Sequence, residues 1–229
     1  MNDQTIVDKD LSGLLSKYLS EDQIDAYIRT IAKEFLPQQP LRLTRTQNQL
    51  DKFFNENIQT QSVRIVSDTL ITYVNEIVSE EKYIQFLLDF SKLVLTQGEL
   101  NLAFEISNMT YTLARKQKGY EQYKAHSLIL IGEYYAYQSN AKEAFAAIKA
   151  ARAIFEALGD RNGMGRCEFL IGSIYTEQGD LKAGKVRMEN CLAFIDQEKE
   201  SILLAQVENN LGIINYLEGN LEAALTLYN

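Results

Sequence analysis

The 229-residue sequence contains few of the residues that mark turns and irregular structure. It has only 2 prolines and 12 glycines, too few for the turn-rich strands of β-sandwiches and barrels or for a collagen-like or low-complexity chain. Hydrophobic residues make up 46% and charged residues 24%, as in ordinary globular proteins. The composition therefore indicates a globular chain of one or two domains and excludes a disordered one.

Residues that build disulfide, metal and catalytic sites are also scarce. One histidine, His126, and two cysteines, Cys167 and Cys191, cannot supply a disulfide framework or a four-ligand zinc site. Each cysteine lies in an apolar helical stretch, so we expect two buried free thiols. The sequence has no Gly-x-Ser-x-Gly elbow and no glycine-rich phosphate loop of standard form. We therefore expect a protein that is not an enzyme and that holds no metal or cofactor.

Positive charge and long apolar runs are likewise lacking. Lys and Arg number 23 against 31 Asp and Glu, which gives a net charge of −8. This charge repels a phosphate backbone, so we expect no nucleic-acid partner. No stretch approaches the roughly 18 apolar residues of a membrane span, and the N-terminus is acidic where a signal peptide would be basic. We expect no membrane insertion and a cytoplasmic location.

The sequence does contain an internal repeat, which three glycines reveal. Gly132, Gly172 and Gly212 are spaced 40 residues apart, and each follows an apolar residue. A helix break comes seven residues after each glycine, and a second run then opens with a small residue at its fourth position. Upstream, Ser91 takes the glycine position of an earlier unit, whose break is at Gly98. The breaks are Ser139-Asn140, Gly179-Asp180 and Gly219-Asn220, and the small residues are Ala144, Gly184 and Ala224.

Each unit has the pattern of two amphipathic helices joined by a short turn. Apolar residues at helical spacing mark the first helix, and residues 142–158 form the second helix of one unit. Small residues at 132 and 144 allow the two helices to approach closely. The segment Gly159–Gly163 is then expected to be the loop between units. These features predict an array of antiparallel helix hairpins.

The repeat resembles the tetratricopeptide repeat (TPR). In the second unit the resemblance rests on Leu128, Ile131, Gly132, Tyr135, Ala144, Ile148 and Ala151. TPR units usually have about 34 residues, and the 40-residue period is similar to that of longer tandem repeats in bacterial regulators. The resemblance implies an all-α fold, a right-handed α-solenoid of antiparallel helix hairpins with an N-terminal helical segment. Four TPR-like units are expected at about 80–119, 120–160, 161–200 and 201–229, the last one incomplete.

Residues 1–79 differ from the repeats, because no glycine occurs between Gly13 and Gly98. Apolar periodicity nevertheless predicts helices here, the last of them over about 62–78. Ser20 and Gln23 have the spacing of a capping box at the start of one helix. Both prolines fall in one short connector, residues 37–40. We interpret 1–79 as an N-terminal helical cap with one degenerate repeat.

The TPR resemblance implies a concave groove that is lined by the first helices and takes a peptide. The family's groove positions lie six and three residues before the glycine and one, four and five after it, and some peptide receptors add an Asn just before Leu-Gly. Phe169 stands out, because the repeat gives it no packing role, whereas Arg166 has the alternative of a surface pair with Glu133 or Glu168. The candidates are Lys92, His126, Ile129, Glu133, Tyr137, Arg166, Phe169, Ser173, Gln206, Asn209, Asn210 and Ile213. Their few charges favour an amphipathic helix or hydrophobic peptide as partner.

Two settings for such an interaction module remain open. The last helix stops early, so Leu225 and Tyr228 lack a covering helix, which we interpret first as a sign of a longer protein. The chain would then be the N-terminal sensory or docking region of a bacterial signalling protein, such as a GGDEF diguanylate cyclase, a histidine kinase or a transcription regulator. The alternative is a free-standing TPR scaffold or chaperone-like adaptor that homodimerises through Leu225 and Tyr228. An enzyme built on helical repeats is a third and weaker alternative.

Overall fold

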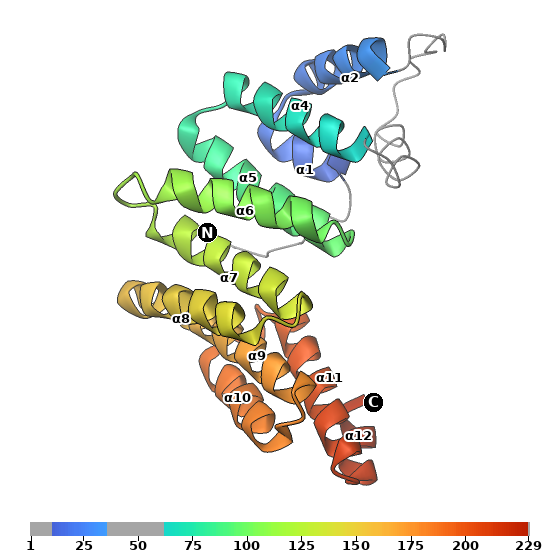
Figure 1. Cartoon of the computed structure of the whole chain (residues 1–229), viewed down its shortest axis with the longest axis vertical. Helices are drawn as coiled ribbons and strands as arrows, with labels where there is room; N and C mark the ends of the chain where they lie inside the picture. The colour runs from blue at the N-terminus through green and yellow to red at the C-terminus, as the bar shows by residue number, and fades with distance from the viewer. Residues whose placement is uncertain (1–10, 36–61, 229) are drawn as a thin grey trace. The chain divides into compact units, whose positions relative to one another are not determined.

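A computed structural model of the chain describes residues 11–35 and 62–228. These residues form eleven α-helices and no strand, and helices adjacent in sequence pack against one another in pairs (Figure 1). The expected all-α class is therefore confirmed, with an arrangement consistent with a helical repeat. Among the described helices, none is both long enough and apolar enough to cross a membrane. The Pro37–Pro40 connector lies outside the described residues.

The described residues divide into two compact units, one up to Met109 and the other from Thr110 onward. The described helices of the first unit are α1 (Leu11–Tyr18), α2 (Glu21–Phe35), α4 (Ser62–Ile77), α5 (Glu80–Thr96) and the larger part of α6 (Leu100–Ala114). In this unit α5 packs against both α1 and α4. The boundary thus falls inside the first expected repeat, 80–119, whose part up to Met109 shares a compact unit with the described helices of the expected N-terminal cap.

Hydroxyl groups connect the helices of this first unit. Tyr27 donates from its buried hydroxyl to the carbonyl oxygen of Val66 at 2.9 Å, which joins α2 to α4. Burial raises the pKa of Tyr27 far above its usual range.

The capping box expected at Ser20 and Gln23 is confirmed at the start of α2. The Ser20 N–H donates to Gln23 Oε1 at 2.9 Å, and the Gln23 N–H donates to Ser20 Oγ at 3.4 Å.

Ser91 shows how the first repeat does without its glycine. The buried Ser91 hydroxyl donates to the carbonyl oxygen of Ala103 on α6 at 2.8 Å and lies 2.6 Å from the Ser107 hydroxyl. In the next repeat, a Cβ atom at Gly132 would come within 2.7 Å of Ile148 Cγ1. Close approach at this position is therefore confirmed, with glycine in one repeat and a small hydrogen-bonded side chain in the other.

The second unit consists of three antiparallel hairpins that follow one another along the chain (Figure 1). Its helices are α7 (Glu121–Tyr137), α8 (Ala141–Leu158), α9 (Arg161–Glu177), α10 (Leu181–Phe194), α11 (Ser201–Leu217) and α12 (Leu221–Tyr228). Helix α9 packs against α7, α8, α10 and α11. The first helices of successive hairpins therefore contact one another, in addition to the helix that follows each in sequence.

The turn between α8 and α9 is shorter than the expected loop Gly159–Gly163. Gly159 ends α8 in the left-handed conformation, with φ at 68°, and the Asp160 carboxylate accepts the Gly163 N–H at 2.8 Å as the cap of α9. Helix α9 therefore begins at Arg161. Gly163 lies inside this helix. A glycine is needed at this position because the backbone faces the buried Phe155 ring, which leaves no space for a Cβ atom.

Candidate functional site

Helix α11 carries a stripe of exposed side chains along one face. Four large apolar residues on it, Ile202, Ile213, Tyr216 and Leu217, are 58%, 37%, 62% and 57% exposed. At about 100° per residue, the exposed residues from Ile202 onward fall within about 120° of the helix surface. The opposite face is buried. We define the α11 stripe as Ile202, Ala205, Gln206, Asn209, Ile213, Tyr216 and Leu217.

The α11 stripe contains no charged residue. Glu208 is the only charged residue of the 17 in α11, and it lies about 100° from Asn209 around the helix, at the edge of the stripe. Near its N-terminal end the stripe forms an open hollow lined by Ser201, Ile202, Ala205, Gln206 and Asn209. The surface therefore combines apolar contact area with side-chain amides that can donate and accept hydrogen bonds.

The equivalent positions on the preceding first helices are covered. Asn209 corresponds to Phe169 on α9 and to Ile129 on α7 by the 40-residue spacing. Ile129 is a buried residue of the core shared by α7, α8 and α9, and Phe169 is half-buried against this core and the next one. Ile129 is therefore inaccessible to a partner, and Phe169 has the packing role that the repeat pattern did not assign to it.

The groove candidates on α7 are in mixed surroundings. The half-buried His126 ring makes an edge contact with Phe155 at 5.1 Å between centroids. Glu133 is also half-buried, whereas Tyr137 is exposed at the C-terminal end of α7. Partial burial, with smaller contributions from the charges of Glu133 and Glu177, raises the pKa of Tyr137. Of these three residues, only Tyr137 presents a largely free surface.

Arg166 has a different partner from the two expected. Its guanidinium lies 3.5 Å from the Glu200 carboxylate, and Glu200 also accepts the Asn162 side-chain amide at 3.3 Å. The Asn162 carbonyl oxygen in turn accepts the Asp196 N–H at 3.0 Å. Arg166 therefore takes part in joining the start of α9 to the connection between α10 and α11.

Glu168 is a polar residue that the sequence patterns did not single out as buried. It is only 2% exposed on α9, and it accepts hydrogen bonds from Arg152 Nε on α8 at 3.1 Å and Arg187 Nη1 on α10 at 2.9 Å. The Asn190 side-chain amide adds a longer contact at 3.4 Å. A charged group is stable in such a buried place only when it is paired and hydrogen-bonded. Glu168 is therefore a structural link across three successive helices.

Three of the remaining candidates make contacts within their own helices. Lys92 pairs with Asp89 at 3.4 Å, and the hydroxyl of Ser173 donates to the carbonyl oxygen of Phe169. Asn210 donates to the carbonyl oxygen of Gln206 in its own helix. Of the two expected self-association residues, Leu225 is exposed, while the Tyr228 side chain lies outside the described residues.

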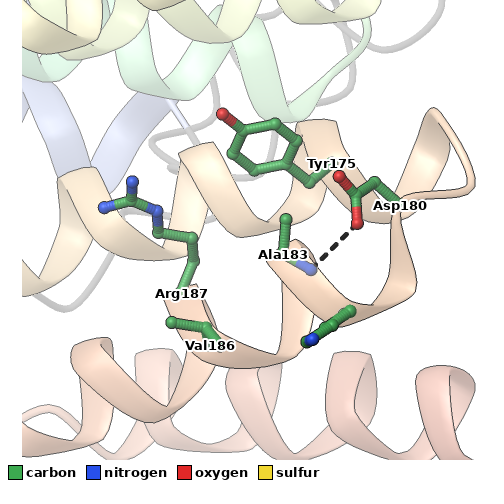
Figure 2. Close-up of a pocket in the computed structure, with 6 residues that line it drawn as sticks. Tyr175, Asp180, Ala183, Val186 and Arg187 are labelled. Atoms are coloured by element: carbon green, nitrogen blue, oxygen red, sulfur yellow. Dashed lines mark hydrogen bonds between the residues drawn. The ribbon is translucent and has the colours of Figure 1, made fainter.

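A second open hollow lies on the hairpin of α9 and α10 (Figure 2). It is lined by Tyr175, Asp180, Lys182, Ala183, Val186 and Arg187. Two of its polar groups have local structural roles: the Asp180 carboxylate accepts the Ala183 N–H at 3.0 Å and caps α10, and Arg187 pairs with Glu168. This hollow is therefore a weaker candidate for a binding site than the α11 stripe.

Nothing in the described part of the chain has the geometry of a metal or thiol-based site. No group of three or more potential ligands comes together among the described residues. Cys167 and Cys191 are free and buried, as expected, and burial raises the pKa of each thiol to about 12. A thiol with so high a pKa is a poor nucleophile at neutral pH.

These features show an all-α protein of paired helices, an arrangement consistent with a helical repeat. Its structure is similar to the crystal structure of BtubC (BKLC) from P. vanneervenii, with a TM-score of 0.58 over 90% of this chain and 87% of that chain. The two sequences are 16% identical, so the likeness concerns the fold alone. No family model and no curated protein matches the sequence.

Proposed function

We propose that the protein is a non-catalytic, TPR-like interaction module that binds an amphipathic helix on the α11 stripe. The observation that carries the proposal is the row of exposed apolar and amide side chains on a helix face without charge. Large apolar residues that stay exposed in a patch commonly mark an interaction site. Tyr and Ile supply contact area at low entropic cost, and amides can position the ligand.

The packing of the preceding repeats supports a helix as the ligand. Helix α9 packs against α7, and α11 packs against α9, so the first helix of one hairpin contacts the first helix of the next. The α11 stripe occupies the position that corresponds to the covered residues Ile129 and Phe169. From Ile202 to Leu217 it is about 22 Å long at 1.5 Å per residue, which matches about four turns of a bound helix.

The TPR resemblance and the 40-residue period favour a wider setting in bacterial signal transduction, with this chain as a cytoplasmic sensory or docking region. A free-standing scaffold or adaptor is the alternative setting. Both settings depend on recognition of another protein, so both need a binding surface. The binding activity can therefore be tested before the setting is known.

The test is a screen of displayed helical peptides of about 16 to 20 residues for binding to the whole chain. We expect peptides with one apolar face and few charges on it to be selected, and Ile213→Glu to reduce their affinity at least tenfold. Leu158→Glu, a change of an exposed residue on α8, is the matched control and should leave affinity unchanged. Circular dichroism confirms that both variants are folded. Selection of no peptide, or of peptides that bind Ile213→Glu equally well, would overturn the proposal.

A further inference from the structure

We propose that the helix bound by the α11 stripe is α11 of a second copy of this chain, antiparallel to the first about a twofold axis at Asn209. This inference rests on the proposed function, because it names the partner of the same surface. It differs from the expected self-association through Leu225 and Tyr228, since the contact lies on α11 and not on α12.

The first argument is that the stripe is close to symmetric about Asn209. Ile202 lies seven residues before Asn209 and Tyr216 lies seven residues after it, while Gln206 and Ile213 lie three before and four after. In an antiparallel pair centred on Asn209, Ile202 faces the partner's Tyr216, and the two Asn209 amides meet at the axis. A twofold contact requires this kind of self-complementary surface.

The second argument is electrostatic. Each copy has a net charge of −8, so two copies repel one another, and the repulsion is smallest where they meet through an uncharged surface. The α11 stripe is such a surface. Glu208 lies outside it, at the rim, where the twofold axis brings the two Glu208 residues to the same side. Salt screens that repulsion, so association should strengthen as ionic strength rises.

The size of the stripe sets the expected strength. A face about 22 Å long and about 11 Å wide covers about 240 Å² per copy, whereas a stable interface buries about 800 Å² per partner. The pair is therefore weak and concentration-dependent. The Asn209 amides at the centre favour the register in which they meet, because an Asn left unpaired at the axis would lose its hydrogen bonds to water without replacement.

The first experiment measures mass in solution by sedimentation or light scattering, from micromolar to millimolar concentration. We expect the mass to rise from 26.1 kDa towards twice that value, and Asn209→Asp or Asn209→Lys alone to weaken association at least tenfold by placing like charges on the axis. A mixture of the two variants should restore pairing as a heterodimer. Leu158→Asp and Leu158→Lys, changes of an exposed residue on α8, are made alone and mixed as the controls and should behave as the wild type.

The second experiment uses a disulfide to report the geometry. Both native cysteines are buried, so Asn209→Cys introduces the only exposed cysteine, and oxidation should give a covalent dimer. Glu189→Cys on α10 is the matched control and should stay monomeric under the same conditions. Equal yields of dimer from the two variants would overturn the twofold contact at Asn209.

The outcomes separate this inference from the proposed function. A mass of 26.1 kDa at every concentration, with no heterodimer from the mixed variants, would overturn self-pairing. If a selected peptide still bound wild type and failed to bind Ile213→Glu, the proposed function would stand with a different partner. If Ile213→Glu weakened neither peptide binding nor self-association, both the proposed function and the self-pairing would be overturned.

Discussion

Ser139 and Gly179 occupy the same position in successive repeats and share a left-handed backbone, with φ at 54° and 81°. Each lies in the turn between the two helices of its hairpin, and Gly98 and Gly219 have the same conformation in the neighbouring turns. Ser139 is the only non-glycine residue with positive φ among those described. An L-residue in this conformation costs about 1 kcal/mol relative to the right-handed region.

Ser139→Gly should therefore stabilise the protein. Relief of the left-handed conformation contributes about 1 kcal/mol, and the greater freedom of glycine in the unfolded chain offsets part of it, which leaves a gain of about 0.5 kcal/mol. Urea unfolding measures the change. Gly179→Ser is the reciprocal variant and should lower stability by a similar amount. A stability unchanged by both would mean that these turns do not constrain the backbone.

Glu168→Gln should destabilise the second unit by about 2 kcal/mol, because it removes the negative charge between Arg152 and Arg187. Glu156→Gln is the matched control, since the Glu156 carboxylate also pairs with Arg152, at 3.5 Å, but its side chain is 67% exposed against 2% for Glu168. An exposed ion pair contributes about 0.5 kcal/mol or less. Equal effects of the two variants in thermal unfolding would contradict a buried role for Glu168.

The two thiols should react slowly with a disulfide reagent at neutral pH. Burial raises the pKa of Cys167 and Cys191 from 9.0 to about 12, so the native state keeps the thiol protons up to a higher pH than the unfolded state does. Their contribution to stability is present below pH 9 and is lost as the pH rises towards 12. The measurement is the labelling rate against pH, with guanidinium-unfolded protein as reference. Labelling of native protein as fast as the unfolded reference would contradict this burial.

Gly163→Ala should destabilise the hairpin interface by about 1–3 kcal/mol, because a Cβ atom would overlap the Phe155 ring. Phe155 is fully buried in the core shared by α7, α8 and α9. The Phe155→Leu background provides the control, since removal of the ring should make Gly163→Ala nearly neutral there. A double-mutant cycle in urea isolates this coupling, and additive effects would show that the ring is not the obstacle.

Among the described residues, the sequence predicted the helices well, because their ends depend on local chemistry. Gly179 and Asp180 end one helix and cap the next, and Ser20 and Gln23 cap each other, as residue type and spacing indicate. The start of α9 was placed too late, since glycines at 163 and 165 are typical of a loop. Here the close packing of Phe155 and Ile195 against the two glycines outweighs the low helix propensity of glycine.

The candidate site was harder to predict, because exposure depends on the neighbouring repeat. Ile129, Phe169 and Asn209 are equivalent by position, yet the first is buried, the second half-buried and the third exposed. The signal was present in the residue types, which are apolar at 129 and 169 and polar at 209. Glu168 could not be recognised, since Arg152 and Arg187 lie on two other helices and meet it only in the folded chain.

The position of Glu168 also bears on how the array opens. A solenoid is commonly described as a row of units coupled only to their nearest neighbours, and each interface then sets how far partial unfolding spreads. Release of either α8 or α10 would leave the Glu168 charge with one arginine fewer in a buried place. Protection from amide hydrogen exchange should therefore be lost in α8, α9 and α10 together, so that two neighbouring hairpins behave as a single cooperative foldon.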